Sequence, residues 1–92
     1  MIRLEQRTYK EINRELAKRL SAIRKRKKLS QSELASRSGV SFGSLKRFEQ
    51  TGEISLQSFT KLMIALGTQE EMENLLTEVP FSSIEEVING QS

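Results

Sequence analysis

The segment FGSLKRFEQ, residues 42–50, places side chains that can bind a nucleic acid on one face of a helix. With a period of about 3.6 residues, that face carries Phe42, Gly43, Lys46, Arg47 and Gln50. The guanidinium of Arg47 can donate paired hydrogen bonds to guanine O6 and N7. The ammonium of Lys46 is a compact charge that suits a phosphate. Leu45 and Phe48 lie on the opposite face, which we expect to be buried.

Simpler interpretations of Arg47 and Phe42 stay open at this point. Arg47 could contact a base, contact a phosphate or be a solvated surface side chain. Phe42 has no hydrogen-bonding capacity, so in a groove it could touch only apolar groups, above all the thymine methyl. It could instead fold back onto Val40 or a neighbouring loop as part of a satellite core.

The inventory of reactive side chains argues against an enzyme. The chain has no His and no Cys, and all 12 acidic residues are Glu. The usual general bases, nucleophiles and metal ligands are therefore largely missing. Glu, Lys, Ser and a single Tyr remain, but no spacing pairs them for chemistry. We expect no catalytic residue, no metal and no cofactor.

Charge is divided unevenly along the chain. Residues 1–50 hold 14 Lys or Arg against 5 Glu, a net charge of +9, whereas residues 51–92 hold 1 Lys against 7 Glu, a net charge of −6. A basic half suits a polyanion, and an acidic half suits another partner. The basic run at 24–28, RKRKK, could clamp DNA or could simply be a solvated face.

Length and hydropathy indicate one small domain. A chain of 92 residues buries about two-thirds or less of its unfolded surface, so partner subunits often add stability. The lack of Cys fits a reducing compartment. No apolar run approaches the roughly 20 residues that span a bilayer, and the N-terminal MIRLEQR lacks the apolar stretch of a signal peptide. We therefore expect a cytoplasmic protein without a membrane segment.

Capping signals predict the helices that position these side chains. Thr8 with Glu11 and Ser30 with Glu33 match the capping box. Ser41 and Ser55 are suited to cap two further helices, and glycines at 39, 52 and 67 are suited to the C-terminal ends. The first four helices are predicted at about 9–27, 31–38, 42–50 and 56–66.

A third T-x-x-E string, from Thr68 to Glu71, predicts a fifth helix that carries Met72, Leu75 and Leu76. Pro80 breaks the chain, and residues 83–89 could form a short sixth helix. No stretch alternates convincingly with a period of two residues. The predicted fold class is therefore all-α, with five helices and a C-terminal tail.

The two short helices joined by Gly39-Val40-Ser41 are typical of a helix-turn-helix motif, here at residues 31–50. Over about residues 23–76, the chain resembles the lambda-repressor-like helix-turn-helix family, also called the xenobiotic-response-element regulators. The matching pieces are Leu29-Ser30-Gln31, Leu34-Ala35, Gly39-Val40-Ser41, Leu45, Glu49, Gly52 and Leu66-Gly67. The resemblance implies a compact five-helix domain that binds operator DNA, usually as a dimer.

The resemblance also implies roles for single residues. It places base contacts at Phe42, Gly43 and Arg47, a phosphate contact at Gln31, and Arg24 opposite Glu49, for which we predict an ion pair. Further phosphate contacts are expected from Lys46, from the hydroxyls of Ser41 and Ser44, and from backbone N–H groups of Thr51 and Gly52. The alternative for Ser30 and Ser41 is a purely structural role as helix caps.

The two ends of the chain extend beyond this resemblance. Residues 1–76 are expected to form the DNA-binding domain, and residues 77–92 a tail for dimer or partner contact. An N-terminal helical lead and a short acidic tail resemble HipB-type antitoxins, which repress their own operon and bind a HipA-like kinase toxin. Apolar residues near the C-terminus could form a two-fold dimer interface or cover their own domain: Leu75, Leu76, Val79, Phe81, Ile84, Val87 and Ile88.

The resemblance thus implies a sequence-specific transcriptional repressor, a homodimer on a near-palindromic stretch of double-stranded DNA. Such a protein is expected to be associated with the nucleoid. A narrower form of this expectation is the antitoxin of a toxin–antitoxin system that regulates its own operon. The competing interpretation is a helix-turn-helix domain that serves as a protein-interaction module without specific DNA binding. The apolar Phe42 beside Gly43 would suit such a module.

Overall fold

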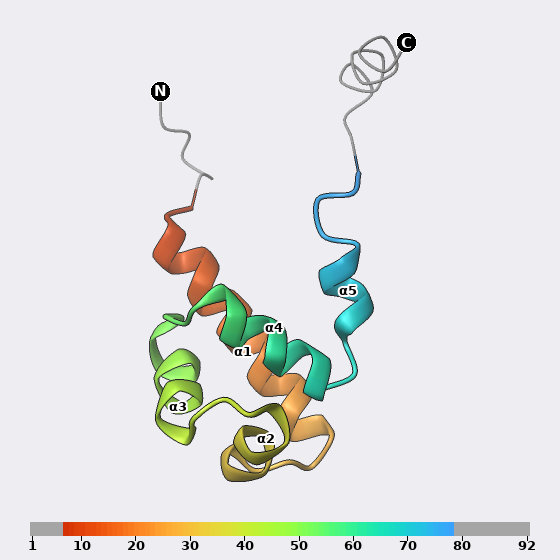
Figure 1. The fold of residues 1–92 in the computed structure, drawn as a ribbon. Helices are drawn as coiled ribbons and strands as arrows, with labels where there is room; N and C mark the ends of the chain where they lie inside the picture. The colour runs from red at the N-terminus through yellow and green to blue at the C-terminus, as the bar shows by residue number, and fades with distance from the viewer. Residues whose placement is uncertain (1–6, 79–92) are drawn as a thin grey trace, which may run out of the picture.

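Five α-helices make up the part of the chain that the computed structural model describes, residues 7–78 (Figure 1). They are α1 (Tyr9–Arg26), α2 (Gln31–Ser38), α3 (Phe42–Thr51), α4 (Leu56–Ala65) and α5 (Gln69–Glu73). Residues 7–78 contain no strand, so the predicted all-α class is confirmed. The bounds of the first four helices agree with the capping signals to within one residue.

Side-chain caps begin four of these helices. Thr8 and Ser30 each form the complete capping box, in which the cap hydroxyl accepts from the backbone N–H of Glu11 or Glu33 and that glutamate accepts in return. Ser41 and Ser55 each accept from the N–H group three residues on. Each such cap typically stabilises its helix by about 1 kcal/mol. The caps therefore fix where the helices begin, and with them the short turn between α2 and α3.

The core lies where α2, α3 and α4 meet the second half of α1. Its largest fully buried side chains are Phe48, Leu34, Leu45, Leu62 and Leu66. Phe48 also meets Phe59 of α4 edge to face, with the ring centroids 5.7 Å apart. Burial of each such side chain is worth about 1.5–3 kcal/mol. The burial predicted for Leu45 and Phe48 is confirmed, and Val40 in the turn between α2 and α3 is buried with them.

The predicted capping box at Thr68 and Glu71 is wrong. Thr68 makes no side-chain cap, since its hydroxyl donates to the carbonyl oxygen of Met63 at 2.9 Å. The backbone N–H of Thr68 donates to the same Met63 oxygen, and the backbone N–H of Gly67 donates to the carbonyl oxygen of Ile64. These two bonds form the Schellman motif that ends α4. Thr68 is thus held by the preceding helix and cannot cap the next one.

The fifth helix is also shorter than predicted. It ends at Glu73, so Leu75 and Leu76 lie in the turn that follows, and Leu76 has a positive φ of 64°. Leu76 is 91% exposed. The possible sixth helix at 83–89, like most of the tail 77–92, lies outside the described residues.

Candidate nucleic-acid interface

The outer face of α3 carries the side chains that the sequence assigned to DNA. Phe42, Gly43, Lys46, Arg47 and Gln50 are all exposed, whereas Leu45 and Phe48 on the inner face are buried. In Figure 1, α3 lies at the edge of the helical part that the structure describes, residues 7–78. The division of the helix into a packed face and a free face, predicted from its period, is therefore confirmed.

Phe42 and Gly43 begin α3 beside the turn. Phe42 is 46% exposed and does not belong to the buried core cluster. A methyl group added at Gly43 would meet no atom within 4 Å. The packing of the described residues therefore does not demand a glycine at position 43. A side chain there would begin on the exposed face of α3, toward whatever that face contacts.

Arg47 is paired with an acidic residue that sequence reasoning missed. Its Nη2 lies 2.7 Å from Oε1 of Glu53, and the two side chains are 67% and 64% exposed. An ion pair this exposed typically adds no more than about 1 kcal/mol to stability. Glu53 lies six residues beyond Arg47 and outside the helix, so no helical spacing links the two. The left-handed backbone of Gly52, with φ of 83°, brings Glu53 back beside α3.

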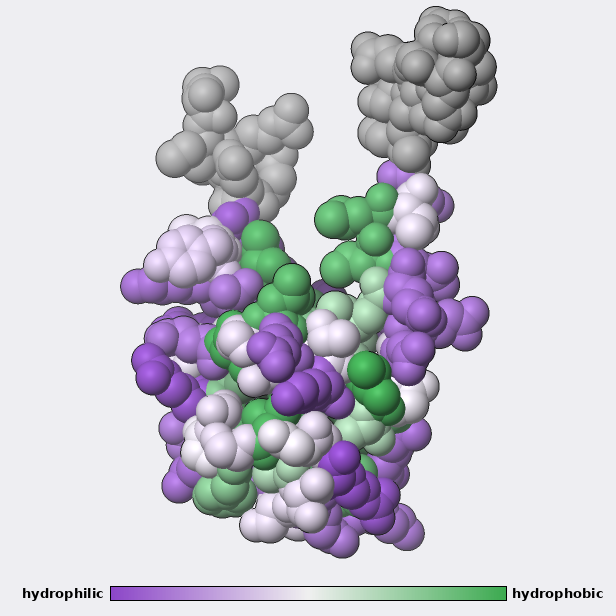
Figure 2. Space-filling view, viewed as in Figure 1, coloured by the Kyte–Doolittle hydropathy of each residue, from purple (hydrophilic) through white to green (hydrophobic). Residues whose placement is uncertain are grey.

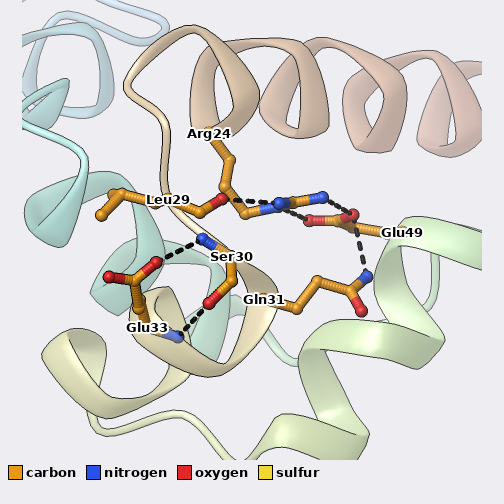
Figure 3. Close-up of polar contacts among 6 residues, drawn as sticks. All are labelled: Arg24, Leu29, Ser30, Gln31, Glu33 and Glu49. Atoms are coloured by element: carbon orange, nitrogen blue, oxygen red, sulfur yellow. Dashed lines mark hydrogen bonds and ion pairs between the residues drawn. The ribbon is translucent and has the colours of Figure 1, made fainter.

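Arg24 and Glu49, the pair expected from the family pattern, meet at the centre of a buried network (Figure 3). The guanidinium donates from Nε to Oε2 of Glu49 at 2.7 Å and from Nη2 to Oε1 at 2.9 Å. Its Nη1 donates to the carbonyl oxygen of Leu29 at 2.7 Å. The two side chains are only 9% and 7% exposed. This network joins α1, the α1–α2 turn and α3.

Gln31 completes the network from the start of α2. Its Nε2 donates to Oε1 of Glu49 at 3.0 Å, as Figure 3 shows. An amide nitrogen has two hydrogens, so one remains for another acceptor. The predicted phosphate contact of Gln31 stays a prediction, but the side chain that would make it is oriented by Glu49.

Thr51 and Gly52 do not offer the free backbone groups that we expected of them. Thr51 is the last residue of α3 rather than part of the loop, and its hydroxyl donates to the carbonyl of Arg47. Gly52 is buried, and its N–H donates to the carbonyl of Phe48 at 2.7 Å. The proposed phosphate contact through the Gly52 N–H is therefore wrong, because that donor closes the helix.

The serines and the basic run divide between structural and exposed positions. Ser41 accepts from the N–H of Ser44 and donates to its hydroxyl at 2.8 Å. Within the run 24–28, Arg24 is buried while the other four residues are exposed. The cap role weighed for Ser41 is thus present, and the run offers four positive charges rather than five to a ligand.

The pKa of Glu49 reflects this buried network. Burial raises the pKa, but hydrogen bonds from Arg24 and Gln31 and the charge of Arg24 outweigh it, so the pKa lies below the ordinary value of 4.5. The pKa values of Glu11 and Glu33 are lowered as well, because each carboxylate accepts from the backbone N–H and the hydroxyl of its capping partner.

These lowered pKa values predict a protein that is destabilised by acid. Carboxyls that titrate lower in the folded state give stability that is complete above about pH 4.5 and is lost as the pH falls through their folded-state pKa. We expect the melting temperature to fall between pH 5 and pH 3, with a smaller fall in Glu49→Gln. Thermal melts across this range measure both. An equal fall in the two proteins would mean that Glu49 does not contribute.

Residues 7–78 bring together no group of three His, Cys, Asp or Glu side chains that could hold a metal ion. None of the five helices there is long and apolar enough to cross a membrane.

Comparison with known proteins adds one finding to this geometry. A family model described as helix-turn-helix matches residues 20–72, more than half of the chain. The matched region begins within α1 and ends within α5, so it includes the buried network and the exposed face of α3. No curated protein matched the chain.

Proposed function

The chain belongs to the lambda-repressor-like helix-turn-helix family, and from this premise we propose that it is a sequence-specific DNA-binding repressor of transcription. The observation that carries the proposal is the exposed outer face of α3. On that face Arg47 and Lys46 are exposed together with the half-exposed Phe42, while the residues of the opposite face are buried in the core. An exposed helix with this chemistry suits the major groove, where base edges can be distinguished.

In this proposal the residues act in two groups. Arg47 donates to a guanine, Phe42 contacts a thymine methyl, and Gly43 leaves room for the approach of a base or the DNA backbone. Lys46 and Gln31 bind phosphates, and the hydroxyls of Ser41 and Ser44 are further candidates for phosphate contacts. Repression follows from occupancy, because a protein bound across a promoter excludes polymerase. No catalytic step or cofactor is needed.

We extend the proposal to a homodimer on a near-palindromic operator. Exposed apolar side chains on α1, on α4 and after α5 support it: Ile12, Leu16, Leu56, Ile64, Leu75 and Leu76. Figure 2 shows apolar surface on the facing sides of α1 and the α5 end. A surface of this kind often marks an interface. A two-fold dimer would read half-sites about 10 bp apart, centre to centre.

Selection from a random duplex library tests the function. The full chain should enrich one motif with two related halves. Its affinity for that motif should fall by about 10³-fold or more between 50 and 200 mM salt, if it neutralises about six phosphates or more. Enrichment of no motif, or an affinity that salt leaves unchanged, would favour a protein-interaction module instead.

Single substitutions on α3 then assign the base contacts. Arg47→Ala should relax the preference at one guanine position, and Phe42→Ala at one thymine position, each by about 1–3 kcal/mol of discrimination. Repeating the selection with each variant measures these changes position by position. If Phe42→Ala lowers the melting temperature and leaves the selected motif intact, Phe42 serves the core rather than the groove.

The antitoxin role is a narrower form of the same proposal. The described residues that suit a separate partner are the exposed acids of α5, Glu70, Glu71 and Glu73, whose charge is opposite to that of the α3 face. Co-purification of the chain with the product of a neighbouring gene tests this role, and a kinase-like partner is the expected result.

A further inference from the structure

Arg47 and Glu53 belong to a closed set of contacts at the C-terminal end of α3. The Thr51 hydroxyl donates to the carbonyl oxygen of Arg47 at 2.8 Å and accepts from the backbone N–H of Glu53 at 3.1 Å. The Glu53 carboxylate in turn accepts from Nη2 of Arg47 at 2.7 Å. The Thr51 hydroxyl thus fixes the backbone of Glu53 beside α3, and the Glu53 carboxylate in turn holds the guanidinium of Arg47.

Stability does not explain this arrangement. Both side chains are largely exposed, and an exposed ion pair contributes little to folding. The pair lies in a shallow depression between α3 and the start of α4, together with Ser44, Ser55 and Ser58. The Arg47–Glu53 pair does fix the direction of the Arg47 guanidinium, and it adds a negative charge beside it. Both effects act on the outer face of α3, which is proposed to contact DNA.

A carboxylate beside Arg47 has opposite effects on the two kinds of DNA contact. Against a phosphate, the negative Glu53 repels the ligand and competes for the same guanidinium. Against a guanine, the competition is weaker, since O6 and N7 carry no formal charge. The guanidinium has five N–H donors, and Glu53 occupies one of them, so the others remain for a base edge.

We propose that Glu53 is a specificity-determining residue, which positions Arg47 for a guanine and withholds it from phosphates. The inference rests on the proposed function, because it assigns to Glu53 a part in the DNA contact made by α3. Non-specific binding depends almost entirely on phosphate contacts. Glu53 therefore lowers non-specific affinity more than it lowers affinity for the operator, and so raises the ratio between them.

Glu53→Gln tests the proposal with little change in shape. Affinities for the selected duplex and for a scrambled duplex are measured over a salt series by fluorescence anisotropy. The variant should bind the scrambled duplex about three- to tenfold more tightly, and the ratio of specific to non-specific affinity should fall by a similar factor. The preference at the guanine position assigned to Arg47 should weaken in a repeated selection.

Glu15→Gln is the matched control. Glu15 also forms an exposed ion pair, with Arg19 on α1 at 3.7 Å, and its substitution makes the same change in net charge. It should leave the ratio of affinities within about twofold of the wild type. If Glu53→Gln changes the ratio no more than Glu15→Gln does, Glu53 is not a specificity determinant.

A second arm separates positioning from general charge. In an Arg47→Ala background, Glu53→Gln should no longer change the preference at the guanine position, because the guanidinium that it positions is gone. An unchanged effect in that background would overturn the proposal. If the wild-type chain enriches no motif, the proposed function fails together with this inference. If it enriches one and only the ratio fails to respond, the inference alone is wrong.

Discussion

Arg24→Met is expected to lower the free energy of unfolding by about 3–5 kcal/mol, because it leaves a buried carboxylate without its counter-ion. Glu49 would keep the hydrogen bond from Gln31 but lose both bonds from the guanidinium, and the carbonyl of Leu29 would lose its donor. In a domain of this size the melting temperature should fall by at least about 12 °C. Denaturant unfolding followed by circular dichroism measures the change.

Two controls make this result interpretable. Arg26→Met removes the same kind of side chain from an exposed position two residues on, and should change stability by only about 0.5 kcal/mol. Adding Glu49→Leu to Arg24→Met removes the orphaned charge and should restore much of the loss. If Arg24→Met lowers the free energy of unfolding no more than Arg26→Met does, the Arg24–Glu49 pair contributes no more to stability than a surface salt bridge.

The same substitution connects stability to function. Glu49 is part of α3, and through Arg24 and Gln31 it ties that helix to α1 and to the start of α2. Loss of the network would free α3 to shift relative to α2, and both are proposed to contact one stretch of DNA. A displacement of even 1 Å can be costly where several contacts must be made together. We therefore expect the network to keep the proposed binding surface in one arrangement.

The sequence predicted those parts of the fold that depend on short-range signals. Ser30 with Glu33 and Ser41 before α3 are caps whose partners lie three residues away, so the string of residues is enough to place them. The exposed face of α3 follows from helical period in the same way. The Arg24–Glu49 pair has no such signal, because its members lie 25 residues apart. It was expected only from the resemblance to a family.

The features that sequence reasoning missed depend on competition or on backbone direction. Thr68 has the same T-x-x-E spacing as Thr8, but it directly follows Gly67 and is bonded to the end of α4. Thr8 has no described helix before it to compete for its hydroxyl. Glu53 was missed because a left-handed residue reverses the chain between it and Arg47. Neither the T-x-x-E spacing nor the helical period shows a competing hydrogen-bond partner or the direction of the chain after a helix.

Gly52→Ala is expected to be the most damaging glycine substitution among the described residues. The residue has a φ of 83°, which costs an L-amino acid about 1–2 kcal/mol. In addition, a Cβ atom there would lie 2.8 Å from the backbone carbon of Asn13 and 2.9 Å from the backbone nitrogen of Arg14. These atoms belong to α1 and cannot rotate away, so α1 and α3 would have to separate. Forced overpacking of this kind costs about 1–3 kcal/mol more.

Gly39→Ala is the control that separates the two causes. Gly39 also has a left-handed backbone, with φ of 77°, but an added Cβ atom would meet nothing within 4 Å. Gly39→Ala should therefore lose only the conformational part, about 1–2 kcal/mol, while Gly52→Ala should lose about 2–5 kcal/mol in the same denaturant titration. Equal losses would show that contact between α1 and the Gly52 backbone is not a constraint. A larger loss in Gly52→Ala would show that the close approach of α1 adds to the conformational cost at this position. The left-handed turn at Gly52 thus serves the packing of α1 as well as the position of Glu53 beside Arg47.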